Sequence, residues 1–112
     1  MTRPSRPDEV FSASFWACDD FTNDDLKMID MLPYLSFLDL DGSDITDAGL
    51  VHLKELRGLS RLGLSETNIT DDGIEHLVGL QELEHVSLGG TRVTEAGVTR
   101  LKTAIPGVEV RR

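Results

Sequence analysis

Apolar and polar residues alternate along this chain in an order that repeats every 24 residues. In the segment 35–58, LSFLDLDGSDITDAGLVHLKELRG, a tight apolar alternation is followed by a threonine and then by more widely spaced leucines. The segments 59–82 and 83–106 carry similar residues at the matching positions. Self-similarity at a fixed short period is typical of solenoids, in which each unit buries its apolar side against the next one.

The first half of each repeat predicts a short β-strand. Leu38 and Leu40 are two residues apart, so both side chains point to one side of a strand, which we expect to be the buried side. Because successive repeats run in the same direction, their strands are expected to form a parallel sheet. A hydroxyl follows in the turn of three repeats and is expected to bond a backbone group there. These hydroxyl residues are Ser43, Thr67 and Thr91.

The second half of each repeat predicts a short helix. Thr46 followed by Asp47 suits a helix start, because a threonine cap and an acid in the first turn satisfy free N–H groups. Gly58 and Gly79 are expected to end helices. A glycine inside each helical half is expected to let the helix lie close to the sheet. These glycines are Gly49, Gly73 and Gly97.

The repeat frame extends towards the N-terminus in a less regular form. Residues 1–9 have two prolines and no apolar periodicity, so we expect a flexible arm there. A degenerate first repeat occupies residues 11–34. With a constant period, its Ser14 falls on the position of Leu38, which places Phe15 on the outward side of the strand.

At the other end, Val108-Glu109-Val110 predicts one more strand. We expect its two valines to match Leu38 and Leu40 after a deletion of two residues. The expected organisation is one domain over residues 10–112. It consists of repeats 11–34, 35–58, 59–82 and 83–106 and a capping strand at 107–112.

The repeated residues resemble a leucine-rich repeat of the form Leu-x-x-Leu-x-Leu-x-x-Thr-x-Ile-Thr-Asp-x-Gly-Leu. The resemblance implies an α/β leucine-rich-repeat solenoid, with a parallel β-sheet on its concave side and short helices on its convex side. What such a repeat binds depends on its variable positions. Similar repeats also occur in substrate adaptors of ubiquitin ligases, so the resemblance implies that role as one alternative.

Composition and charge narrow the classes of function. A hydrophobic content of 39% and a mean hydropathy of −0.16 fit a folded chain. The net charge of −9 argues against nucleic-acid binding, and no apolar run is long enough to span a membrane. The segment from Asp8 to Asp47 contains eleven acidic residues and only one basic residue, Lys27, so one end of the solenoid should be acidic. The single cysteine, Cys18, and the lack of a visible signal segment make the cytoplasm the expected location.

The side chains that alternate with the buried leucines define the candidate binding surface, because they point out of the concave face. Exposed aromatic residues beside charged ones often anchor protein interfaces. A protein or peptide partner is therefore expected to contact this face. The candidate protein-binding residues are Phe15, Phe37, Asp39, Asp41, Arg61, His85 and Ser87.

Other chemistry has weaker support in the sequence. The fragment Asp39-Leu40-Asp41-Gly42 is too short for a calcium loop, and His52 and His76 lack a third zinc ligand, so neither a metal nor another cofactor is expected. Cys18 has no base near it in the repeat frame, and we expect no catalytic residues. The remaining alternative is self-assembly through the solenoid ends, in which the acidic first repeat of one copy meets the arginine-bearing last strand of another.

Overall fold

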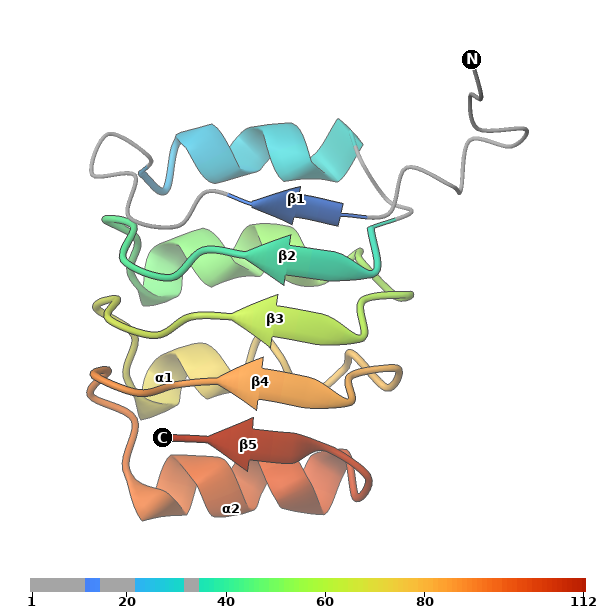
Figure 1. The fold of residues 1–112 in the computed structure, drawn as a ribbon, viewed down its shortest axis with the longest axis vertical. Coiled ribbons are helices and arrows are strands. Elements are labelled where there is room, and N and C mark those ends of the chain that lie inside the picture. Colours follow the sequence, from blue (N-terminus) through green and yellow to red (C-terminus); the bar gives the residue numbers. More distant parts are fainter. Residues whose placement is uncertain (1–11, 15–21, 32–34) are drawn as a thin grey trace.

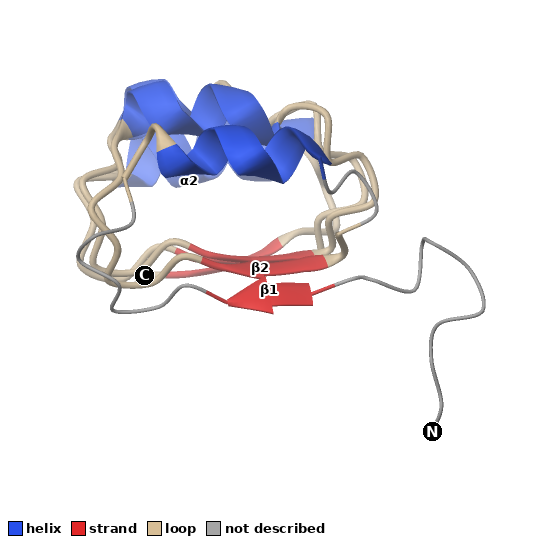
Figure 2. Cartoon of the chain, turned by 90° about the horizontal axis from the view of Figure 1, so that it is seen from above, coloured by secondary structure: helices blue, strands red, loops and turns tan. Residues whose placement is uncertain are grey.

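The structure is a computed structural model that describes residues 12–14, 22–31 and 35–112. A parallel sheet of five strands in chain order forms one layer, and helices cover one of its faces (Figures 1 and 2). Within the described residues, the other face of the sheet carries no helix (Figure 2). The strands are β1 (Ser12–Ser14), β2 (Phe37–Asp39), β3 (Arg61–Gly63), β4 (His85–Ser87) and β5 (Glu109–Arg111).

Each strand except β5 is followed by a short helical segment. The first two segments, η2 (Asp25–Met31) and η3 (Asp47–Leu53), are 3₁₀ helices. The last two, α1 (Asp71–Ile74) and α2 (Glu95–Ala104), are α-helices. Successive helical segments pack side by side along the solenoid. The predicted alternation of parallel strands and short helices is therefore confirmed.

Repeated leucines build the core as columns that run through the stack. Leu38, Leu62 and Val86 are register partners on β2, β3 and β4, and each is at most 2% exposed. Because each residue packs against its equivalent in the next repeat, apolar burial joins the repeats into one continuous core. The 24-residue period thus fixes the register from β2 to β4.

The predicted hydroxyl column is also confirmed. Ser43 Oγ donates to the carbonyl oxygen of Leu40 at 2.7 Å, and the hydroxyl of Thr67 is equally buried. Each of these hydroxyls bonds the carbonyl three residues before it, in a turn that has no strand partner for that group. The other two bonds run from Thr67 Oγ1 to Leu64 at 2.5 Å and from Thr91 Oγ1 to Leu88 at 2.6 Å.

The threonines at the helix starts join neighbouring repeats, which corrects the local role expected for them. The backbone N–H of Thr70 donates to Asp47 Oδ1 of the preceding repeat at 2.8 Å, and the Thr70 hydroxyl donates to the second carboxylate oxygen. Asp71 holds Thr94 in the same way, at 2.7 and 2.5 Å. Of these two threonines, only Thr70 also caps its own helix, by accepting from the N–H of Asp72. We call the inter-repeat pairs the repeat clamp.

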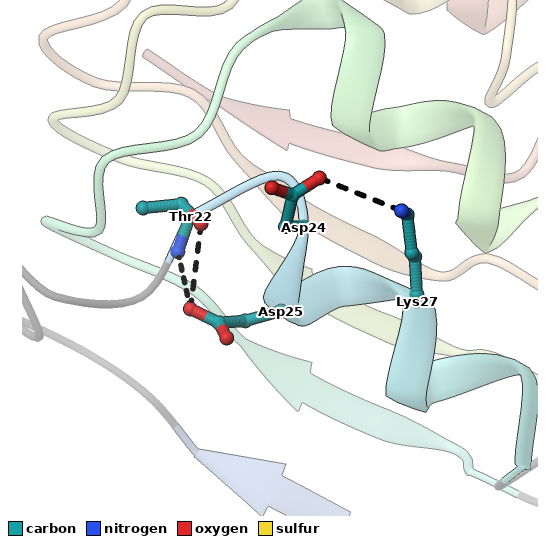
Figure 3. Close-up of polar contacts among 4 residues, drawn as sticks. All are labelled: Thr22, Asp24, Asp25 and Lys27. Carbon is teal, nitrogen blue, oxygen red and sulfur yellow. Dashed lines mark hydrogen bonds and ion pairs between the residues drawn. The ribbon is translucent and has the colours of Figure 1, made fainter.

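The first two repeats show how the clamp begins. Asn23 takes the place of the acid: its Oδ1 accepts from the N–H of Thr46 at 2.9 Å, and its Nδ2 donates to the Thr46 hydroxyl at 2.7 Å. The N–H of Thr22 instead donates to Asp25, within its own repeat, at 3.0 Å (Figure 3). Asp25 stands at the position that glycine occupies in the later repeats. A residue of the same repeat thus satisfies the first helix start.

The clamp explains the helical glycines better than the predicted contact with the sheet. A Cβ atom on Gly73 would collide with the carboxylate of Asp47 and lie 2.9 Å from Leu50 Cδ1. Gly49 and Gly97 meet the clamp residues Asn23 and Asp71 in the same way. The expectation of a close approach was therefore right, but the neighbour is the clamp side chain of the preceding repeat.

The prediction that Gly58 and Gly79 end helices is wrong. The helices η3 and α1 end at Leu53 and Ile74, several residues earlier. Neither glycine has a positive φ, and a Cβ on either would meet nothing within 4 Å. The left-handed position lies instead in the turn after the strand, at Gly42, Glu66 and Gly90, with φ of 74°, 59° and 75°.

Both terminal strands pair away from the predicted frame, β1 by one residue and β5 by two. In β1, Ala13 is the partner of Leu38, where the constant period had placed Ser14. The first repeat therefore contains one extra residue between Ser14 and Thr22, which a constant period cannot accommodate. In β5, Val110 is the partner of Val86, so the deletion of two residues is wrong and the 24-residue period continues to the last strand.

Candidate functional site

The candidate site lies on the face of the sheet opposite the helices, which we call the open face (Figure 2). Strand register arranges its outward side chains in two rows across the strands. The first row consists of Phe37, Arg61, His85 and Glu109. The second row consists of Asp39, Gly63, Ser87 and Arg111.

Six of the seven predicted site residues line one shallow hollow of about 360 Å³ on this face. The seventh, Phe15, lies outside the described residues. The hollow extends from β2 to β5, so Glu109 and Arg111 also line it. These side chains were predicted to share one face because they alternate along each strand with the buried residues. The predicted residues that line the hollow are Phe37, Asp39, Asp41, Arg61, His85 and Ser87.

Two carboxylates lie at the β2 end of the hollow. Asp39 Oδ1 accepts from the N–H of Asp41 at 3.1 Å, and Asp41 Oδ1 accepts from the N–H of Ser65 at 2.8 Å. Partial burial raises the pKa of Asp41, the Ser65 bond opposes this, and the neighbouring charge of Asp39 adds to the increase. Both carboxylates lean over Gly63, since a Cβ there would lie 2.8 Å from an oxygen of each.

An aromatic and a cationic side chain stand beside this acidic pair. The side chain of Phe37 is 38% exposed and is one of two large apolar residues exposed in the described part of the chain. The side chain of Arg61, the register partner of Phe37 on β3, forms no hydrogen bond or ion pair with another described residue. These groups offer a partner an apolar contact and a positive charge within one strand spacing of about 4.8 Å.

The β5 end of the hollow is less acidic. His85 Nδ1 lies 3.8 Å from Glu109 Oε2, which is a loose contact between half-exposed side chains. Arg111 adds a positive charge on the last strand. The open face therefore carries two carboxylates at its β2 end, a guanidinium on β3, and one carboxylate beside one guanidinium on β5.

The described residues contain neither a metal-binding cluster nor a membrane-spanning helix. Within 12–14, 22–31 and 35–112, no cluster of three or more histidine, cysteine or acidic side chains is arranged to hold a metal ion. In that same part of the chain, no helix is both long and apolar enough to cross a membrane. Cys18 lies outside the described residues.

Comparison with known proteins identifies the fold. No protein-family model and no curated protein matches the chain. Among solved structures, an LRR protein of Leptospira interrogans is similar over 77% of this chain, with a TM-score of 0.59 and 20% identity. An internalin of Listeria monocytogenes is similar over 78%, with a TM-score of 0.55 and 18% identity. The chain spans only 21% and 31% of the length of these two proteins.

A structure of Mex67:Mtr2 subunits from Chaetomium is similar over 89% of this chain and 76% of its own, with a TM-score of 0.69 and 21% identity. The chain therefore has the leucine-rich-repeat fold that its sequence resembles: an α/β solenoid with a parallel sheet on one side and short helices on the other.

Proposed function

We propose that this chain is a non-catalytic interaction module that binds a protein or peptide on its open face. The supporting observation is the hollow from β2 to β5, in which exposed Phe37 stands beside the Asp39–Asp41 pair and Arg61. Aromatic and arginine side chains carry much of the binding energy in protein interfaces. The carboxylates and the guanidinium give a partner charges to match, which favours one orientation over others.

The rigidity of the face supports the proposal. The outward side chains of β2, β3 and β4 stand beside inward residues that are buried in the core, and clamps join the helical sides of adjacent repeats. A surface held in place before binding loses less conformational entropy when the partner arrives. The face is small, so the partner segment is expected to be a peptide or one edge of a folded domain.

Partner capture from native lysate tests the proposal. The protein bound by the wild type should be lost from the Phe37→Ala/Asp39→Ala variant, while the melting temperature of that variant stays near the wild-type value. Val51→Ala is the matched control, because Val51 is 41% exposed but belongs to η3 on the helical side. Binding that survives in the double variant, or that is lost in the control alone, would contradict the assignment of the site.

Head-to-tail self-assembly is a second candidate, favoured by the charge of the two ends. Asp24 and Asp25 lie at the start of η2 in the first described repeat, whereas Arg111 and Arg112 lie at the last strand. Such assembly should weaken as the salt concentration rises. Chains of more than two copies in sedimentation at low salt support it, and a species of unchanging size at every salt concentration contradicts it.

A further inference from the structure

In the described part of the chain, the last helix, α2 (Glu95–Ala104), has no other helix packed on its outer side. The helices η2, η3 and α1 each pack against the next helical segment along the stack. Among the described elements, α2 packs against α1 on one side and contacts β5, and these two form the last layer of the described chain (Figure 1). A second hollow, of about 300 Å³, lies between α2 and β5.

The core columns continue into this hollow and are only partly covered there. Val98 stands at the position of Leu50 and Ile74, which are fully buried, and Val110 is the register partner of buried Val86. Both valines are half-buried. The end of the core therefore exposes apolar surface in the place where another helix would otherwise pack.

The side chains of α2 that line this hollow form a self-complementary stripe. They follow the spacing i, i+3, i+4 and i+7, which places them on one helix face: Glu95, Val98, Thr99 and Lys102. When a second copy of α2 packs antiparallel, Glu95 stands opposite Lys102 of the second copy, and Lys102 opposite Glu95. Val98 then meets Thr99 of the second copy at the centre. An acid at one end and a base at the other is the pattern that a twofold contact needs.

We propose that two copies of this chain form a twofold dimer through their α2 stripes. The head-to-tail arrangement uses a different surface, because it joins this end to the acidic first repeat. In the twofold arrangement the axis is parallel to the sheet normal, so the helical layers stay adjacent and both open faces point the same way. The dimer therefore presents two binding faces to one side, which raises the apparent affinity for a repeated or clustered partner.

The stripe is short, so the dimer is expected to be weak. The ten residues of α2 span about 15 Å, and the contact falls below the size of stable protein interfaces. Analytical ultracentrifugation of the 112-residue chain, from about 10 µM to about 1 mM, covers the range in which such a contact is detectable. The wild type should shift from monomer to dimer over this range and should stop at two copies.

Charge reversal at the stripe tests the geometry. Glu95→Lys places like charges opposite each other, and so does Lys102→Glu, so each variant alone should dimerise at least about tenfold more weakly. An equimolar mixture of the two variants restores opposite charges at both positions and should form a heterodimer of near wild-type strength. Lys54→Glu and Glu82→Lys are matched controls, because they make the same charge changes at exposed sites of other repeats.

The outcomes are distinct. A wild type that stays monomeric at about 1 mM overturns the proposal, and so does folded Glu95→Lys or Lys102→Glu protein that dimerises like the wild type. A mixture that fails to form the heterodimer also overturns it. The proposal does not depend on the open face, and the Phe37→Ala/Asp39→Ala variant should therefore dimerise like the wild type.

Discussion

Side chains vary from repeat to repeat much less on one side of the solenoid than on the other. The repeated chemistry lies in the turns and helix starts, which we call the turn side, and the varied side chains lie on the open face. On the turn side, the same chemistry recurs from repeat to repeat: a hydroxyl at Ser43, Thr67 and Thr91, and a clamp residue at Asn23, Asp47 and Asp71. On the open face, one row reads phenylalanine, arginine, histidine and glutamate from β2 to β5.

The difference separates the needs of the backbone from those of a partner. A turn has the same unsatisfied N–H and carbonyl groups in every repeat, so the same side chain is useful each time. An outward position on the open face has no such requirement, and its side chains are available for recognition. The two sides should therefore respond differently to substitution, the turn side in stability and the open face in binding.

The largest contrast should occur between two adjacent residues of β3. Leu62→Ala removes a core side chain that is 2% exposed and should lower the free energy of unfolding by about 2–5 kcal/mol. Arg61→Ala changes an exposed side chain and should leave stability within about 0.5 kcal/mol while weakening partner binding. Urea denaturation of both variants measures the difference. An Arg61→Ala protein as unstable as Leu62→Ala would remove the distinction between the two sides.

The clamp should show the next largest effect. Asp47→Ala removes the acceptor for both the N–H and the hydroxyl of Thr70, and should lower the free energy of unfolding by about 1–3 kcal/mol. Asp47→Asn is the matched control, since Asn23 already holds Thr46 through an amide. Thermal melting of the two variants checks the prediction. Equal melting temperatures for Asp47→Ala and the wild type would show that the clamp adds no stability.

The sequence predicted the parts of the fold that the period itself carries. The register of β2, β3 and β4 and the outward position of Phe37 follow directly from a 24-residue offset and the alternation of a strand. The gathering of six candidate residues in one hollow follows for the same reason. Whether that hollow binds a partner stays a prediction.

The clamp could not be predicted by considering each repeat alone. Asp47 follows Thr46 directly, so local rules assign it to the start of its own helix, whereas its bonding partner is Thr70, 23 residues later. For a similar reason, the repeat pattern alone predicts that Gly73 lets its helix lie close to the sheet, whereas the nearest atoms belong to the Asp47 side chain of the preceding repeat. The shift of β1 depends on one extra residue before Thr22, which a constant period does not reveal.

A smaller gain in stability is expected in the turn after β3. Glu66 has a φ of 59° where the equivalent positions are Gly42 and Gly90, so a side chain there is strained. Glu66→Gly should raise the free energy of unfolding by up to about 1 kcal/mol. Glu66→Ala keeps the Cβ atom and should give no such gain. Denaturant unfolding of the two variants measures the difference. An equal gain in the free energy of unfolding for both variants would contradict strain at this position.

The smallest effects should appear in the pH dependence of stability, which has opposite signs for Asp71 on the turn side and Asp41 on the open face. Hydrogen bonds from Thr94 hold the pKa of Asp71 below its ordinary value of 3.8, so its contribution to stability is present above that pH and is lost as the pH falls through its folded pKa. Burial raises the pKa of Asp41, so its charged form is the less favourable one in the folded chain. The stability that its protonated form contributes is complete below pH 3.8 and is lost as the pH rises through the raised pKa.

Asp41→Asn should therefore be slightly stabilising at pH 7, by at most about 0.5 kcal/mol, because the amide oxygen can still accept from the N–H of Ser65 and carries no charge. The gain should shrink as the pH falls through the raised pKa of Asp41, because the carboxyl of the wild type then becomes protonated. Asp71→Asn should behave in the opposite sense, with a deficit at pH 7 that shrinks in acid. Melting temperatures between pH 3 and pH 7 measure both curves, and curves of the same sign would contradict the assignment. A partner that binds the wild type more tightly than Asp41→Asn at pH 7 would then indicate that this carboxylate is kept on the open face for recognition, at a small cost in stability.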